Sequence, residues 1–299
     1  MNVFVTGSCG FIFSNFIRKV IYNKMDYSIS SIDKIPNTHI LNNIYQNKNN
    51  SFYIGNVCDE HLLNVIFTHE QPDLIIHGAA ETSIYSNNVN DYFSNIESTQ
   101  RLLQACVNHR VKRFIYISST DTLGDNLSPY GLSKKMCEDL VLYYNKKYNL
   151  DYNIIRLCQV YGPREFNNKL IPNMINGIIH NATVSLANNG DNKKDWLHVS
   201  EVVNAITSVI ENGEINKSYD LLSSNQVKDV EVLEILADVA KIDMEKIIVA
   251  GKSDRYYSKC VKGDSSILNT GWSQQLSLRS GLEMTFDWYK NNIWWYKKP

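Results

Sequence analysis

The 299-residue sequence has few of the features of a disulfide-stabilised, fibrous or membrane-spanning chain. It holds only six prolines and six cysteines, and no two cysteines form a Cys-x-x-Cys pair. In a chain of this length, scattered cysteines indicate buried or free thiols in a reducing compartment. No apolar run approaches the ~20 residues that a membrane helix needs. The cysteines are Cys9, Cys58, Cys106, Cys137, Cys158 and Cys260.

Neither sign of charge is in excess, because 30 Lys+Arg face 31 Asp+Glu for a net charge of -1. That balance gives no general electrostatic reason to bind nucleic acid or an anionic membrane. The apolar N-terminus, Met1 to Phe13, has no basic leader and no small-residue cleavage site, so we predict no signal peptide. The seven histidines show no metal-ligand spacing, so no metal is expected. We therefore expect a globular, cytoplasmic protein that binds neither nucleic acid nor membrane.

Short β-rich runs alternate with segments of helical spacing through the first half of the chain. The alternation predicts βαβ units and a parallel sheet, that is, an α/β fold of the Rossmann type with a doubly wound sheet. Strands are expected at Asn2–Thr6, Ser28–Asp33, Asp73–His77, Lys112–Ser118 and Tyr152–Leu157. Helices are expected at Phe11–Asn23, Glu60–Glu70, Asn90–His109 and Tyr130–Tyr148.

Beyond Pro163 the pattern becomes less regular, which suggests a second and smaller lobe. We expect residues 1–165 to form a nucleotide-binding Rossmann domain, to which part of 195–225 returns. Residues 166–299 are expected to form mainly a C-terminal substrate-binding lobe.

The first predicted strand runs directly into a glycine turn that reads Gly7-Ser8-Cys9-Gly10-Phe11-Ile12-Phe13. Such glycines let the backbone approach a pyrophosphate, and the following helix supplies N–H groups and a positive dipole. A purely structural turn is the alternative, since Phe13 replaces the third glycine. Asp33 follows Gly10 by 23 residues, where an acid would bind ribose hydroxyls and repel a 2′-phosphate. Asp33 therefore favours NAD over NADP, although the neighbouring Lys34 weakens that preference.

A second group of residues follows the strand Lys112–Ser118. Thr120 and Asp121 end this strand, and Tyr130 comes nine residues after Asp121. Lys134 lies four residues further on, on the same helical face. A lysine ammonium beside a nicotinamide cation can lower the pKa of a tyrosine and make it a usable base. A surface helix pair is the alternative, but the position downstream of a glycine turn favours catalysis.

These motifs resemble the extended short-chain dehydrogenase/reductases that act on nucleotide sugars, over nearly the whole chain. The motifs are Thr6-Gly7-x-x-Gly10-Phe11-Ile12, His77-Gly78-Ala79-Ala80-Glu81-Thr82-Ser83, Tyr161-Gly162-Pro163-Arg164, Lys169-Leu170-Ile171-Pro172, Asp195-Trp196-Leu197-His198-Val199 and Asp287-Trp288-Tyr289 through Trp294-Trp295. The later motifs and Ser-Thr-Asp at the strand end look most like dTDP-glucose 4,6-dehydratases. The short loop between Asp121 and Tyr130 is instead similar to that of UDP-N-acetylglucosamine 4,6-dehydratases. Thr122 stands where these two groups have Glu and Lys, the residue expected to move the carbon 5 proton.

The resemblance implies a nucleotide-sugar 4,6-dehydratase, a lyase that forms a 4-keto-6-deoxy sugar, with or without inversion at carbon 5. Its substrate would be a UDP- or dTDP-hexose, UDP-N-acetylglucosamine among them. It assigns Tyr130 to the carbon 4 hydroxyl proton, Thr120 to the same oxygen and Asp121 to the departing carbon 6 hydroxyl. One alternative is a 4-epimerase, which needs only Thr120, Tyr130, Lys134 and the cofactor and usually lacks an acid at the Asp121 position. Another is a non-catalytic paralogue that binds a nucleotide sugar, suggested by Phe13 and Thr122.

The resemblance also implies binding residues, a cofactor and a partner. NAD is the expected cofactor, with NADP as the alternative, and the helices Asn90–His109 and Tyr130–Tyr148 are expected to pair in a homodimer. Cofactor contacts are expected from Gly7, Cys9, Gly10, Phe11, Ile12, Asp33, Lys34, Asn56, Val57, Gly78, Ala79, Ala80, Tyr130 and Lys134. Substrate contacts are expected from Glu81, Thr82, Ser83, Thr120, Arg164, Lys169, Leu170 and Lys194, the last two lysines and the arginine pairing with the diphosphate.

Overall fold

The computed structural model describes residues 1–23, 25–34, 50–82, 92–124, 127–223, 226–247, 249–252 and 262–296. A seven-stranded sheet organises the larger part of the molecule, in the order β10-β6-β5-β4-β1-β2-β3. Every neighbouring pair in it is parallel. The predicted Rossmann-type parallel sheet is therefore confirmed.

The predicted strands of this sheet agree with the observed ones to within one residue at each end. The strands are β1 (Asn2–Thr6), β2 (Ser28–Asp33), β3 (Asn50–Ile54), β4 (Leu74–His77), β5 (Arg113–Ser119), β6 (Asp151–Leu157) and β10 (Lys217–Leu221). The helices around it are α1 (Phe11–Tyr22), α3 (Glu60–Glu70), α4 (Phe93–Asn108), α5 (Pro129–Tyr148) and α7 (Val199–Asn212). The predicted start of α4 at Asn90 lies outside the described residues. Strands β3 and β10 were not among the sequence predictions.

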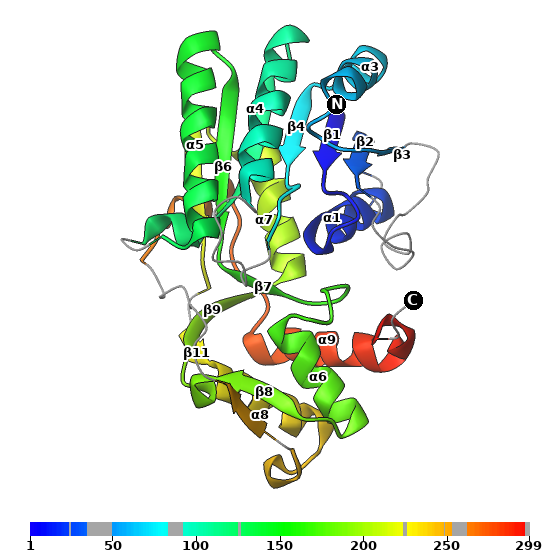
Figure 1. The fold of residues 1–299 in the computed structure, drawn as a ribbon, viewed down its shortest axis with the longest axis vertical. Coiled ribbons are helices and arrows are strands. Elements are labelled where there is room, and N and C mark those ends of the chain that lie inside the picture. Colours follow the sequence, from blue (N-terminus) through cyan, green and yellow to red (C-terminus); the bar gives the residue numbers. More distant parts are fainter. Residues whose placement is uncertain are drawn as a thin grey trace.

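The sheet is buried on both faces, because alternate residues of each strand enter two different apolar cores. Val3 and Val5 of β1 pack with α1 and α7, while Phe4 between them packs with α3, α4 and α5. Figure 1 shows α4 and α5 side by side along the sheet and α1 close to α7. This layering explains why the strands read as short continuous apolar runs.

A smaller lobe lies below the carboxyl ends of the main strands in Figure 1. Its sheets have the orders β11-β9-β7 and β12-β8. The strands are β7 (Gln159–Tyr161), β8 (Val184–Ala187), β9 (Lys193–His198), β11 (Gln226–Lys228) and β12 (Val249–Lys252). The helices are α6 (Leu170–His180), α8 (Asp229–Ala240) and α9 (Leu278–Asn291). Short 3-10 helices are η2 (Thr120–Leu123), η3 (Asn188–Gly190), η4 (Met244–Lys246), η5 (Ser266–Thr270) and η6 (Ile293–Tyr296).

The chain passes between the two lobes more than once. After β9 it returns through α7, which packs against α1, and through β10, which pairs with β6 at the edge of the main sheet. The apolar core of the smaller lobe joins α6, α8 and α9 to the aromatic residues Tyr161, Trp196 and Tyr289. Within the described ranges, every helix is too short or too polar to cross a membrane.

Candidate functional site

The carboxyl ends of β1, β4 and β5 lie next to one another and carry the predicted motifs. In an open parallel sheet, ligands bind at this edge, because the loops that leave the strands meet there. Gly7 follows β1, Gly78 follows β4 and Thr120 follows β5. The fold therefore brings the glycine turn, the loop after β4 and the Thr120–Asp121 turn to one side of the molecule.

The glycine turn brings two strand-end loops close together and leaves the start of α1 without a side-chain cap. Gly7 has φ 73°, and a Cβ there would lie 2.9 Å from the backbone N and Cα of Ala79. Gly10 is the N-cap of α1 and no side chain caps that helix, so the first N–H groups of α1 remain for a ligand. The N–H of Cys9 donates to Asp33 Oδ2 at 2.7 Å, which holds the turn against the end of β2. These residues fit a nicotinamide dinucleotide.

Phe13, at the position of the third glycine, belongs to the core rather than to the turn. Its side chain is only 3% exposed, and its ring lies edge-on to that of Phe16 at 6.0 Å between centroids. A Cβ built on Gly78 would lie 1.9 Å from Phe13 Cε2. The large residue at position 13 is thus accommodated by the missing side chain at position 78.

Tyr130 and Lys134 lie on the first turns of α5, as the spacing predicts. Lys134 Nζ is 5.9 Å from the ring centroid of Tyr130 and donates to the carbonyl of Ile117 at 2.7 Å. Burial lowers the pKa of Lys134 to about 8. Burial and the charge of Asp121 raise the pKa of Tyr130. In the protein alone Tyr130 therefore keeps its proton, and a further positive charge is needed to make it a base.

Asp121 packs against the start of α5. Its Cβ and its carbonyl oxygen lie 3.3 Å from where a Cβ on Gly131 would be, so the absence of a side chain at Gly131 admits the acid beside Tyr130. The N–H of Asp121 donates to Ser119 Oγ at 3.2 Å, which fixes the turn after β5. The structure brings Thr120, Asp121, Tyr130 and Lys134 together at one end of β5.

Thr122 points into the protein. It is 9% exposed, and its hydroxyl lies 2.8 Å from the carbonyl oxygen of Ser119 and 3.1 Å from Glu138 Oε1. Glu138 also accepts from Ser118 Oγ at 2.6 Å and from two nitrogens of Arg156 at 2.8 Å. Although burial opposes ionisation, the hydrogen bonds from Arg156 and Ser118 hold the pKa of Glu138 below its ordinary value. Glu138 is thus a neutralised structural carboxylate and no proton acceptor.

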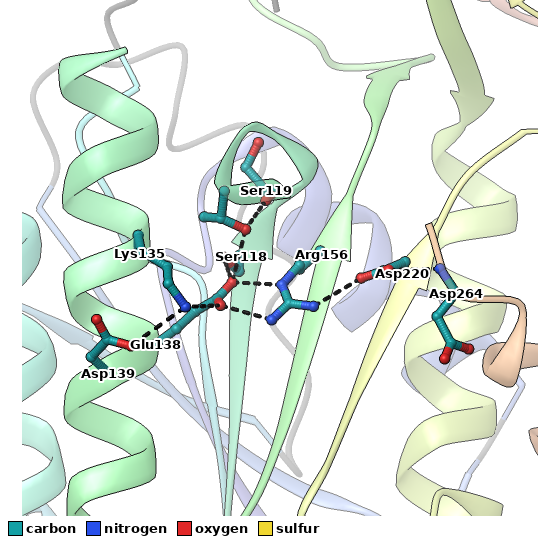
Figure 2. Close-up of polar contacts among 9 residues, drawn as sticks. Ser118, Ser119, Lys135, Glu138, Asp139, Arg156, Asp220 and Asp264 are labelled. Carbon is teal, nitrogen blue, oxygen red and sulfur yellow. Dashed lines mark hydrogen bonds and ion pairs between the residues drawn. The ribbon is translucent and has the colours of Figure 1, made fainter. Parts of the chain in front are cut away.

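Figure 2 shows Arg156 between Glu138 and Asp220, so that one guanidinium joins α5, β6 and β10. Asp220 Oδ2 in turn accepts from the N–H of Asp264 at 2.8 Å. Sequence reasoning missed this network. Only the pairing of Lys135 with Glu138, three residues apart on one helix, could have been predicted from spacing.

The loops after β2, β3 and β4 carry the other predicted cofactor residues. Gly78 and Ala79 donate their N–H groups to Thr6 Oγ1 at 3.2 and 3.1 Å. Asn95 holds the backbone of Glu81, accepting from its N–H at 2.6 Å and donating to its carbonyl at 3.1 Å. Glu81 and Thr82 are exposed, Lys34 is exposed after β2, and Asn56 and Val57 follow β3. Ser83 lies outside the described residues.

The three predicted diphosphate contacts differ in their surroundings. Arg164 has φ 73° and stacks over the ring of Trp288 at 5.3 Å, and burial together with the charge of Arg18 lowers its pKa to about 10. Lys169 is the N-cap of α6, which begins at Leu170. Lys194 Nζ donates to both carboxylate oxygens of Asp229 at 2.8 Å. Lys194 is therefore already neutralised, by a partner that the sequence did not suggest.

Glu165, next to Arg164, is a buried carboxyl group that sequence reasoning also missed. Its Oε2 receives no hydrogen bond from any described residue. Burial raises its pKa to about 8, against the charge of Lys169. The described ranges hold no cluster of three or more His, Cys, Asp or Glu side chains that could bind a metal ion.

Comparison with known proteins adds to this geometry. A model described as the NAD dependent epimerase/dehydratase family matches residues 3–221. The dTDP-D-glucose 4,6-dehydratase of Dictyostelium discoideum is 26% identical over 97% of this chain and 82% of its own length. A trifunctional UDP-glucose 4,6-dehydratase/UDP-4-keto-6-deoxy-D-glucose 3,5-epimerase/UDP-4-keto-L-rhamnose-reductase of Arabidopsis thaliana is 28% identical, and this chain spans 48% of its length. The crystal structure of the dTDP-glucose 4,6-dehydratase from Streptomyces venezuelae with NAD bound has a TM-score of 0.90 at 26% identity, covering 99% of each chain.

Proposed function

The chain belongs to the NAD dependent epimerase/dehydratase family, and on that premise we propose that it is a nucleotide-sugar 4,6-dehydratase. The observation that carries the proposal is the carboxyl group of Asp121 packed beside Tyr130 at the end of β5. Elimination of water from carbons 5 and 6 needs an acid for the departing hydroxyl, whereas inversion at carbon 4 does not. The dehydratases among the relatives support the same reaction.

The reaction divides among the residues of this site. NAD, when bound, supplies the oxidation at sugar carbon 4 and the return of the hydride to carbon 6. Tyr130 Oη takes the proton of the carbon 4 hydroxyl, and Thr120 Oγ1 hydrogen-bonds the same oxygen. Lys134 and the nicotinamide cation together lower the pKa of Tyr130, which burial raises, as does Asp121 while it is ionised. Asp121 in its protonated form donates its proton to the carbon 6 hydroxyl, which leaves as water.

The carbon 5 proton needs a base other than Thr122. A threonine hydroxyl has far too high a pKa, and this one is directed toward Glu138. The other groups to consider are Glu81, Asp125, which lies outside the described residues, and Tyr130 acting with a water. Glu81 is exposed and its backbone is joined through Asn95 to Ser133, one turn after Tyr130. If a base on that loop approaches the other face of the sugar, reprotonation inverts carbon 5, whereas a base on the original face retains its configuration, so both outcomes are to be measured.

The test is incubation of the purified protein with UDP-glucose, dTDP-glucose and UDP-N-acetylglucosamine, with mass detection of a loss of water. We expect dehydration of at least one of them. Asp121→Asn should lose dehydration and keep oxidation of the sugar, read as enzyme-bound reduced cofactor. Thr122→Ala should keep turnover within a few-fold, and carbon 5 read by NMR in deuterated water reports the exchange. A large loss of turnover in Thr122→Ala would show that this hydroxyl is catalytic.

A 4-epimerase is the second candidate, and one observation favours it. Thr122 leaves the site without a carbon 5 base at the expected position, while epimerisation needs only Thr120, Tyr130, Lys134 and NAD. Inversion at carbon 4 without change of mass, seen by NMR with all three sugars, would replace the dehydratase proposal. The intact pair of Tyr130 and Lys134 argues against a merely binding paralogue.

We also propose that the protein is a homodimer built on α4 and α5. These helices pack on each other and leave large apolar side chains exposed, among them Phe93 at 56%, Tyr143 at 55%, and Met136 and Leu142 at 41% each. Burying such a face in a symmetric four-helix contact removes it from water. A monomeric mass by light scattering at micromolar concentration would contradict this.

A further inference from the structure

His77, the last residue of β4, is buried among aromatic rings yet forms hydrogen bonds at both ring nitrogens. It is 1% exposed, and its ring centroid lies 6.0 and 5.8 Å from those of Phe114 and Tyr116. Nδ1 is 2.7 Å from Thr6 Oγ1 and Nε2 is 3.1 Å from Thr99 Oγ1. Burial, with the charge of Lys134, lowers the pKa of His77 to about 3. The ring is therefore neutral, with one nitrogen donating and the other accepting.

The bonds of Thr6 decide which nitrogen of His77 carries the proton. Thr6 Oγ1 accepts two N–H groups, those of Gly78 at 3.2 Å and Ala79 at 3.1 Å. Its own proton is then left for Nδ1 of His77, since a hydroxyl has one donor and two acceptor sites. Nδ1 must accept, so the tautomer is the Nε2–H form. Nε2 consequently donates to Thr99 Oγ1.

Thr99 extends the chain to α4 and α5. Its hydroxyl donates to the carbonyl of Asn95 at 2.7 Å. The side-chain amide of Asn95 binds both the N–H and the carbonyl of Glu81 and contacts Ser133 Oγ at 3.3 Å. Ser133 Oγ donates to the carbonyl of Tyr130 at 2.8 Å. A single path of hydrogen bonds thus leads from the residue before Gly7, through both ends of the segment Gly78–Glu81, to the catalytic helix.

We propose that His77 is a positioning residue for the cofactor, which acts by orienting the hydroxyl of Thr6 so that it captures the N–H groups of Gly78 and Ala79. These two hydrogen bonds keep the backbone of Ala79 against Gly7, where a Cβ on Gly7 would stand only 2.9 Å away. They thereby fix the distance between the glycine turn and the loop after β4, the two segments expected to bind the dinucleotide. The inference rests on the family's NAD cofactor but not on which sugar reaction follows. His77 itself touches neither cofactor nor substrate in this role.

Two substitutions of His77 distinguish this positioning role from a role in packing alone. In His77→Asn, the amide oxygen stands where Nδ1 was and still accepts from Thr6. In His77→Gln, the amide nitrogen stands where Nε2 was and still donates to Thr99, but Thr6 loses its acceptor. Glutamine is the closer match to histidine in volume, so packing alone ranks Gln above Asn. The positioning role ranks Asn above Gln.

Three quantities are measured: the Kd of NAD by isothermal titration calorimetry, the hydrogen exchange of the peptide that holds residues 78–82, and the midpoint temperature of thermal unfolding. We expect His77→Asn to bind NAD within about threefold of wild type. His77→Gln should weaken binding by about tenfold or more, because the hydroxyl of Thr6 loses its acceptor and is no longer held toward the N–H groups of Gly78 and Ala79. Exchange of residues 78–82 should be faster in His77→Gln even where the midpoints of the two variants agree.

A second pair of substitutions, at Thr6, tests the proposal even if the His77 variants fail to fold. Thr6→Ser keeps the hydroxyl, while Thr6→Val keeps the shape and leaves two N–H groups without an acceptor. We expect Thr6→Ser to follow His77→Asn, and Thr6→Val to follow His77→Gln, in both Kd and exchange. Equal NAD affinity in Asn and Gln variants, or Thr6→Val binding like wild type, would overturn the proposal. Neither readout involves sugar turnover, so a failed dehydratase assay leaves this result interpretable.

Discussion

The packing of Phe13 against Gly78 gives a prediction in which the sign of the coupling is fixed by the geometry. The φ of Gly78 is not positive, so Gly78→Ala does not require the left-handed conformation that L residues disfavour. The cost of the substitution comes from the clash with the Phe13 ring at 1.9 Å. Overpacking of this kind costs about 1–3 kcal/mol.

The partner substitution, Phe13→Ala, empties the same space. Deleting a buried phenylalanine costs about 3–5 kcal/mol. If the two effects were independent, the double variant would lose about 4–8 kcal/mol. Because the ring that clashes is the ring that has been removed, we expect the double variant to be no less stable than Phe13→Ala alone. The coupling should be favourable by at least ~1 kcal/mol, with the added methyl group filling part of the cavity.

The assay is urea unfolding followed by tryptophan fluorescence, for wild type, both single variants and the double variant. Gly124→Ala is a matched control, because the nearest atom to a Cβ there is 3.9 Å away and its φ is -86°. It should leave stability unchanged or raise it by about 0.4–1 kcal/mol. Additivity of the two substitutions to within ~0.5 kcal/mol would refute the claim that positions 13 and 78 exchange volume.

Three further predictions follow from the site. Tyr130→Phe should lose at least ~10²–10⁴-fold in turnover while NAD stays bound; activity within a few-fold of wild type would contradict its role as base. Asp33 should make NAD the tighter ligand by about tenfold, the effect of ~1.4 kcal/mol of repulsion, and NADP found in the purified protein would reverse that. Glu165 has a pKa of about 8 in the folded protein against an ordinary 4.5. Between these pH values folding takes up a proton, so the free energy of unfolding falls as pH rises, by up to ~1.4 kcal/mol per pH unit. Glu165→Gln should flatten this slope in urea titrations at pH 5–8.5, and an unchanged slope would show that Glu165 is ionised when folded.

Apolar pattern was enough to predict the central strands and the helices beside them, because both faces of a parallel sheet are buried. Strand β3 escaped prediction because it lies at the sheet edge and its residues are only partly buried, after an Asn-rich run. Strand β10, with the sequence KSYDL, has too few apolar residues to stand out.

The proximity of the candidate catalytic residues was predictable, because strand ends and helical spacing place them together. Their buried partners were not, since those contacts join positions far apart in the chain. Arg156 reaches Asp220 across 64 residues, and nothing near Lys194 indicates that Asp229 neutralises it. Phe13 replaces the third glycine of the turn, and the absence of a side chain at Gly78 makes room for its ring. Only the folded structure shows that these two positions are in contact.

The return of the chain through α7 and β10 makes the larger lobe discontinuous in sequence. A polypeptide cut after residue 165 would lack the strand that covers the edge of β6 and the helix that covers one face of the sheet. Its exposed edge and apolar surface would favour aggregation. Recombination that exchanges the smaller lobe between relatives therefore has to graft two separate stretches around α7 and β10, and a single crossover would divide the core of the seven-stranded sheet itself.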